Sequence, residues 1–86
     1  MGRGRRKSPR KLGGKLREIR LRLDVGQVEM AAKLKRVDET IYPGLISRYE
    51  HGKAEPPLLV LLEYARLGRV SMEALVDDTV RMPDKK

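Results

Sequence analysis

The sequence contains no cysteine, no phenylalanine and no tryptophan, and histidine occurs once in its 86 residues. The absence of cysteine excludes a disulfide and a thiolate metal site, and a lone His51 cannot build a zinc centre. Folding must therefore rest on packing alone, and we expect no cofactor. A chain of this length forms at most one domain with a modest core, which leaves little room for an enclosed substrate pocket.

Long hydrophobic runs are also missing. No segment approaches the ~20 apolar residues that span a bilayer, and the cationic N-terminus is not followed by the apolar stretch of a signal peptide. We therefore expect a cytoplasmic, nucleoid-associated protein without membrane contact. No pair of carboxylates stands out, and His51 falls at the end of a short predicted helix, so we do not expect an enzyme.

Basic residues are abundant and unevenly placed. Lysine and arginine number 20 against 12 acidic residues, and six of the cations lie within the first eleven residues. Such a run of like charge cannot bury enough apolar area to offset its ordering entropy, so residues 1–11 are predicted to be a disordered basic arm. Polyanions are its natural partners, and the alternative is that it only aids solubility. The cations of the arm are Arg3, Arg5, Arg6, Lys7, Arg10 and Lys11.

The next part of the chain has helical periodicity. Apolar residues recur at spacings of four and three, which predicts a surface helix with one buried stripe: Leu12, Leu16, Ile19 and Leu23. A second helix is predicted over 27–34, where apolar and small residues suit close contact with a neighbouring helix: Val28, Ala31, Ala32 and Leu34. Gly26 precedes this helix and offers no capping oxygen.

Residues 35–42 read as a connector, and Pro43 is suited to the first position of a third helix over 43–51. We expect Leu45, Ile46 and Tyr49 to face inward, and Gly52 to end the helix. A fourth helix is predicted over 57–67 and a fifth from Ser71, whose hydroxyl can cap it. The tail 79–86 is expected to be loose. No segment alternates like a strand, so the fold class is an all-α, compact five-helix bundle.

Three stretches resemble the Cro and phage-repressor type (XRE-like) of helix-turn-helix DNA-binding domain over roughly residues 12–78. They are "KLREIRLRLDVGQVEMAAKL", "ISRYEHGKAEP" and "LLEYARLGRVSMEAL". The resemblance implies a lambda-repressor-like fold and a transcriptional regulator that binds double-stranded DNA. The helix over 43–51 would be the recognition helix in the major groove. Repression and activation both remain open.

The resemblance also assigns roles to single residues. It implies that Gln27 touches a phosphate and braces the recognition helix, although an ordinary solvated glutamine is the alternative. Arg20 and Glu50 are expected to form a structural ion pair, while Ser47 and Arg48 face the groove. Lys53, beside the amides around Gly52, suits a phosphate contact, with a merely solvated side chain as the other possibility.

The sequence differs from the family pattern in two ways that affect the recognition of DNA bases. The connector is about five residues longer than usual, and Pro43 and Gly44 occupy positions that commonly read base edges, yet neither has a polar side chain. Connector residues or the arm would have to compensate. The candidate DNA-contacting residues are therefore Arg3, Arg5, Arg6, Gln27, Lys35, Arg36, Thr40, Tyr42, Gly44, Ser47, Arg48 and Lys53.

The predicted fourth helix has more apolar residues than a single buried face can hold. We expect Leu58, Leu61, Leu62 and Ala65 to face inward, which leaves other apolar residues for a homodimer that spaces two recognition helices one DNA turn, ~34 Å, apart. The predicted interface residues are Leu59, Val60, Leu75, Val76 and Val80. Alternatively, Leu59 and Val60 pack under the arm or tail. A further alternative is a protein-interaction module, such as an antitoxin or phage-type regulator, that binds another protein through this helix. RNA binding ranks below both, because the chain has no aromatic stacking platform.

Overall fold

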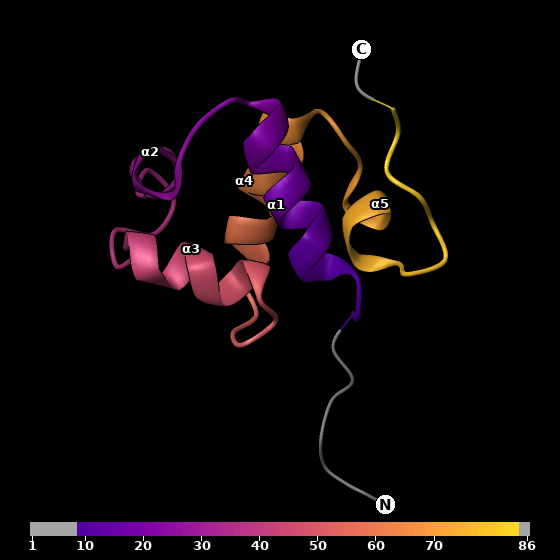
Figure 1. Ribbon diagram of the computed structural model, residues 1–86, viewed down its shortest axis with the longest axis horizontal. Coiled ribbons are helices and arrows are strands. Elements are labelled where there is room, and N and C mark those ends of the chain that lie inside the picture. Colours follow the sequence, from indigo (N-terminus) through magenta and orange to yellow (C-terminus); the bar gives the residue numbers. More distant parts are fainter. Residues whose placement is uncertain (1–8, 85–86) are drawn as a thin grey trace, which may run out of the picture.

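The computed structural model describes residues 9–84, which form five α-helices and no strand. They are α1 (Leu12–Arg22), α2 (Gln27–Leu34), α3 (Pro43–Glu50), α4 (Leu58–Gly68) and α5 (Met72–Val76). Helices α1 and α4 pack together in the middle, α2 and α3 pack on one another to one side, and α5 lies on the other (Figure 1). The all-α prediction is confirmed.

One hydrophobic core joins the helices. Leu12, Leu16 and Ile19 bury the predicted stripe of α1, and Leu23 packs against the core from its edge. Tyr64 of α4 is the largest fully buried side chain. The connector also contributes, because Ile41 is buried among the helix residues. This buried isoleucine anchors the long connector directly in front of α3.

The helix ends follow the local sequence signals. Gly26 precedes α2 with extended backbone, and Glu29 Oε1 accepts a hydrogen bond from the Gly26 amide at 3.0 Å. Pro43 opens α3, as predicted, and Gly52 follows it with a φ of +73°, a conformation that favours glycine. The Ser71 hydroxyl accepts from the Ala74 amide at 3.0 Å and caps α5.

The buried face of α4 differs from the predicted one. Val60, expected outside, is 1% exposed, whereas Leu58, expected inside, is 70% exposed. The buried stripe runs through Val60, Leu61, Tyr64 and Ala65, at the spacing of one helix face. Burial of the large Tyr64 ring fixes the rotation of the helix and turns its first leucines outward.

The buried face of α2 is also rotated relative to the prediction. Val28 and Ala32 are exposed, while Met30, Ala31 and Leu34 are buried. Met30 is a longer side chain than either exposed residue, so its burial removes more apolar surface from water. Only Ala31 and Leu34 of the four predicted residues therefore face the core.

The C-terminal segment is attached to the bundle rather than loose up to Met82. The buried Lys15 ammonium donates to the carbonyl oxygens of Ala74 at 2.6 Å, Asp77 at 3.0 Å and Val80 at 2.9 Å. The Asp78 carboxylate accepts from the backbone amides of Arg10 and Lys11 at 2.8 and 3.0 Å. These bonds tie the segment to the two residues directly before α1. Met82 packs against the core.

Candidate nucleic-acid interface

Helix α3 has one face that takes no part in the core. At 3.6 residues per turn, Gly44, Ser47, Arg48 and His51 lie along one side, opposite the buried Ile46 and Tyr49. We call these four residues the outer stripe of α3. Arg48 and His51 are exposed and Ser47 is half-buried, in agreement with the predicted orientation, whereas the predicted inward Leu45 is only half-buried.

Polar groups at the end of the outer stripe are held in place by the backbone. Nη2 of Arg48 donates to the Lys53 carbonyl oxygen at 3.3 Å. Nδ1 of His51 lies 2.8 Å from the Ser47 carbonyl oxygen. A carbonyl only accepts, so Nδ1 carries the proton of that bond and the other ring nitrogen is left to face outward. Sequence reasoning placed His51 outside but missed it as a possible contact residue.

An aromatic ring lies beside the other end of the outer stripe. A Cβ atom added at Gly44 would lie 3.0 Å from Cε2 and 3.4 Å from Cδ2 of Tyr42, so the ring of Tyr42 lies beside Gly44. The Tyr42 ring is half exposed to solvent. Its own carbonyl accepts from the amide of Leu45 at 2.9 Å, which is the first turn of α3.

A buried ion pair braces α3 against α1. Arg20 Nε and Nη2 donate to the two Glu50 carboxylate oxygens at 2.6 and 3.1 Å, and Nη1 donates to the Val25 carbonyl at 3.0 Å. The hydrogen bond to Glu50 raises the pKa of Arg20, although burial acts in the opposite direction. Nε2 of Gln27, at the start of α2, donates to Glu50 at 3.4 Å. One carboxylate thus joins α1, α2 and α3.

Helices α1 and α3 also touch at the backbone. A Cβ atom at Gly13 would lie only 2.6 Å from the Glu50 carbonyl oxygen. Arg17 follows Gly13 by four residues and precedes Arg20 by three, so it borders the same side of α1. It is exposed, and no ion-pair partner for it occurs within residues 9–84. Sequence reasoning missed Arg17, which the spacing to Gly13 and Arg20 would have placed beside α3.

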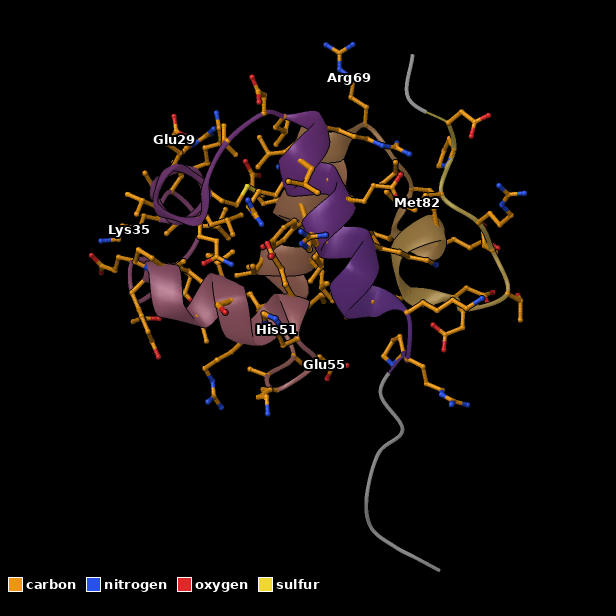
Figure 2. All side chains as sticks on the ribbon, in the orientation of Figure 1. Glu29, Lys35, His51, Glu55, Arg69 and Met82 are labelled. Carbon is orange, nitrogen blue, oxygen red and sulfur yellow. The ribbon has the colours of Figure 1, made fainter. Side chains whose placement is uncertain are left out.

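The connector residues are divided between two sides. Lys35 is exposed and lies near the start of α3, at the opposite end of that helix from His51 (Figure 2). Arg36 Nη1 instead lies 3.8 Å from the Glu63 carboxylate of α4. The Thr40 hydroxyl and amide donate to Asp38 at 2.6 and 3.0 Å, which lowers the Asp38 pKa. Thr40 therefore already has a partner inside the connector.

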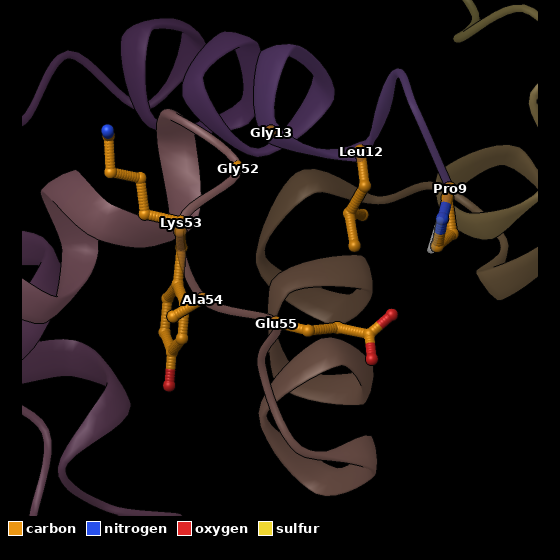
Figure 3. Close-up of a pocket in the computed structure, with 8 residues that line it drawn as sticks. Pro9, Leu12, Gly13, Gly52, Lys53, Ala54 and Glu55 are labelled. Carbon is orange, nitrogen blue, oxygen red and sulfur yellow. The ribbon is translucent and has the colours of Figure 1, made fainter. Parts of the chain in front are cut away.

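The loop between α3 and α4 meets the beginning of the described chain. The exposed Lys53 and Gly52 line a shallow pocket together with Pro9, Leu12 and Gly13, and the side chains of Lys53 and Glu55 leave the loop in different directions (Figure 3). The arginines predicted for the basic arm, Arg3, Arg5 and Arg6, lie outside the described residues. The chain leading to them joins the fold beside the end of α3.

Two of the five residues predicted for a dimer interface are not available to a partner. Val60 and Leu75 are fully inside the core, because the face of α4 is rotated and α5 packs its leucine against α1 and α4. Leu59 and Val76 are exposed, and Val80 is half-buried. Leu58, Val76 and Met72 line a hollow between the start of α4 and α5. Leu58 and Val76 therefore give this hollow an exposed apolar lining.

Across residues 9–84, no helix is long and apolar enough to cross a membrane. No group of three or more histidine or acidic side chains in these residues could hold a metal ion.

The described helices pack into an all-helical fold. A solved structure with this fold is the crystal structure of the P22 c2 repressor protein in complex with a synthetic operator in the presence of Tl⁺. It is similar to this chain with a TM-score of 0.65 and 21% sequence identity, over 78% of this chain and 94% of that one. No protein-family model and no curated protein matches the sequence.

Proposed function

We propose that this protein is a double-stranded DNA-binding transcriptional regulator that uses α2 and α3 as a helix-turn-helix and places α3 in the major groove. The observation that carries the proposal is the outer stripe of α3. It contributes no core residue, is flanked by the exposed Arg17 and Lys53, and belongs to a helix that is braced by the Arg20–Glu50 pair. The fold shared with the P22 c2 repressor, which was solved with an operator, supports the same function.

Within this proposal the cations divide into base and phosphate contacts. Arg48 and Ser47 face base edges, where an arginine can bond the O6 and N7 of guanine. Lys53, Arg17 and Lys35 are exposed at the margins and suit phosphates, which position the protein without reading sequence. Gln27 contacts a phosphate while its amide holds Glu50. The Arg36 guanidinium lies 3.8 Å from the Glu63 carboxylate, so it attracts DNA through its charge and does not contact a phosphate directly.

The basic arm adds affinity for any duplex. Pro9 lies beside Gly52 and Lys53, so the arm begins at the margin of the proposed interface. Arg3, Arg5 and Arg6 then contact phosphates or the minor groove, as arginine-bearing arms do. Removal of residues 2–8 keeps the amides of Arg10 and Lys11 that bond Asp78. It should weaken binding to all duplexes and flatten the dependence on salt.

The exposed apolar surface favours a homodimer. Leu58 and Val76 are exposed and line the hollow between α4 and α5, and Leu59 beside Leu58 is exposed as well. A two-fold contact there would let two copies of α3 bind successive major grooves. The second candidate function uses the same leucines to bind a different protein. Light scattering separates the two, because only the homodimer doubles the mass of the purified protein.

The test of the proposed function is selection from a random duplex library by the purified full chain at about 150 mM salt, where nonspecific charge contacts are weak. Sequencing of the retained DNA should give an enriched palindrome. A retained pool with no preferred sequence would contradict a selective regulator. The matched control is the Arg48→Ala variant, which keeps the fold and should lose preference at defined positions.

A further inference from the structure

The first turn of α3 presents almost no side chain of its own. Its residues are Pro43, Gly44, Leu45 and Ile46, of which Ile46 is buried and Pro43 and Leu45 are half-buried. None of the four has a polar or charged side chain. A recognition helix of this composition has no group of its own with which to hydrogen-bond a base at its leading end.

Tyr42 fills the space that the missing side chain leaves. Around the helix axis, Gly44 points in a direction between those of Ser47 and Arg48. Ser47 is rotated by about 60° to one side of it and Arg48 by about 40° to the other. The edge of the Tyr42 ring lies against the position that a side chain at Gly44 would occupy, and 51% of the tyrosine is exposed. The aromatic ring therefore continues the outer stripe beyond the first turn of the helix.

The glycine leaves room for this position of the ring. A side chain at residue 44 would place its Cβ 3.0 Å from Cε2 of Tyr42, tighter than most carbon contacts, so the ring would shift by a few tenths of an ångström. The backbone of Tyr42 is fixed as well, because its carbonyl accepts from Leu45 and Ile46 in the first turn. The two residues act as one unit, because Tyr42 supplies the contact surface and Gly44 leaves the space in which the ring lies.

The face of the Tyr42 ring is apolar and uncharged, and its hydroxyl is the polar group of the side chain. Arg48 is on the next turn, and the nearby Asp38 carboxylate is occupied by Thr40. Among the groups that base pairs expose in the major groove, the apolar one is the C5-methyl of thymine. We propose that Tyr42 reads thymine at the leading end of α3 by packing its ring against the 5-methyl group. This inference rests on the proposed DNA-binding function.

The probe is the duplex that the full chain enriches from the random library, with each thymine replaced in turn by deoxyuridine, which lacks only the methyl group. Loss of one buried methyl-sized group gives about a fourfold loss of affinity. We expect that loss at one or two thymines in each half of the site, and no loss at the others. No sensitive thymine anywhere in the duplex would overturn the inference.

Variants of Tyr42 show whether its ring makes the contact. Tyr42→Phe keeps the ring and should keep the fourfold sensitivity to deoxyuridine. Tyr42→Ala should abolish the sensitivity at the same thymines while its thermal unfolding shows that the domain is folded. Equal losses of affinity for Tyr42→Phe and Tyr42→Ala would overturn the methyl contact in favour of a hydrogen bond from the hydroxyl.

Gly44 supplies an independent test through a double-mutant cycle. Gly44→Ala alone should reduce the sensitivity at the thymines that Tyr42 reads. In the Tyr42→Ala background the same change should have no further effect on it, because the ring that it displaces is absent. Additive effects would contradict the proposed unit. If the wild-type chain enriches no duplex, the proposed function fails; if it enriches one whose deoxyuridine pattern is unchanged by Tyr42→Ala, only this inference fails.

Discussion

The guanidinium of Arg20 holds the carboxylate of Glu50 through two nitrogens, and both side chains are shielded, with 11% and 2% of their surfaces exposed. Arg20 also bonds the Val25 carbonyl at the end of the turn before α2. The pair therefore fixes the position of α3 relative to α1 and to the start of α2. Since α3 carries the proposed reading surface, the orientation of that surface depends on an interaction outside it.

Breaking this pair from one side should be costly. Arg20→Ala leaves the Glu50 carboxylate buried without its partner, and we expect a loss of about 3 kcal/mol in the free energy of unfolding. Urea unfolding measures it. Arg22→Ala is the matched control, because its partner Glu18, one turn away on α1, is exposed, so the loss should stay below about 1 kcal/mol. Equal losses for the two variants would contradict the bracing role.

The crossing of α1 and α3 predicts opposite effects for adjacent glycines. Gly13→Ala puts a methyl group 2.6 Å from the backbone oxygen of Glu50, so the helices must separate, at a cost of about 1–3 kcal/mol. A Cβ at Gly14 meets nothing within 4 Å, so Gly14→Ala should stabilise the helix by roughly 0.5–1 kcal/mol. Thermal unfolding of both variants checks the prediction, and the same sign for both would contradict it.

Lys15 attaches the C-terminal segment. Lys15→Met removes three hydrogen bonds and leaves the carbonyls of Ala74, Asp77 and Val80 without that donor. We expect a loss of about 1–3 kcal/mol in the free energy of unfolding. Amide exchange should become faster from Ala74 to Met82 while α2 and α3 keep their protection. The control is Lys33→Met on the exposed surface of α2, which should leave exchange in the C-terminal segment unchanged.

Acidification should weaken the contact between the two ends of the fold. Hydrogen bonds from the amides of Lys11 and Arg10 lower the pKa of Asp78 below its ordinary value of 3.8. A lowered folded-state pKa gives stability that is present above the ordinary pKa and is lost as the pH falls through the folded pKa. Stability should therefore decline below about pH 4. Asp78→Asn should make that decline smaller in thermal unfolding scans, and an unchanged profile would contradict it.

The all-α fold and most helix boundaries could be predicted because apolar spacing and end signals are local. Pro43, Gly52 and the Ser71 hydroxyl each act within a few residues of their own position. The rotation of α4 could not be predicted in this way. Its segment "LLVLL" is apolar on every side, so its periodicity does not single out one face. Packing of Tyr64 and Val60 in the core decides it.

The candidate site was predictable to a similar extent. The Arg20–Glu50 pair is present where the family resemblance implied it, and Ser47 and Arg48 lie on the outer stripe. Two other features depend on the path of the long connector. The Tyr42 ring lies beside Gly44, and the Arg36 side chain points towards Glu63. No spacing rule describes that connector, because its course is set by its own Ile41, which is buried among core residues of α1 to α4, most of them far from it in sequence.

Substitution of two arginines at the proposed interface should have different effects: one should reduce discrimination between sequences, and the other should reduce affinity for every duplex. Arg48→Ala removes a side chain from the outer stripe of α3 and should lower discrimination between the enriched duplex and its variants by about 1–3 kcal/mol at one base position. Arg17→Ala removes a cation at the margin of α1. It should weaken all duplexes equally and lower the magnitude of the salt slope by about 0.9 per lost phosphate contact. Fluorescence anisotropy titrations at several salt concentrations measure both quantities. A uniform loss for Arg48→Ala would reassign its contact to a phosphate, and an unchanged salt slope for Arg17→Ala would remove α1 from the interface.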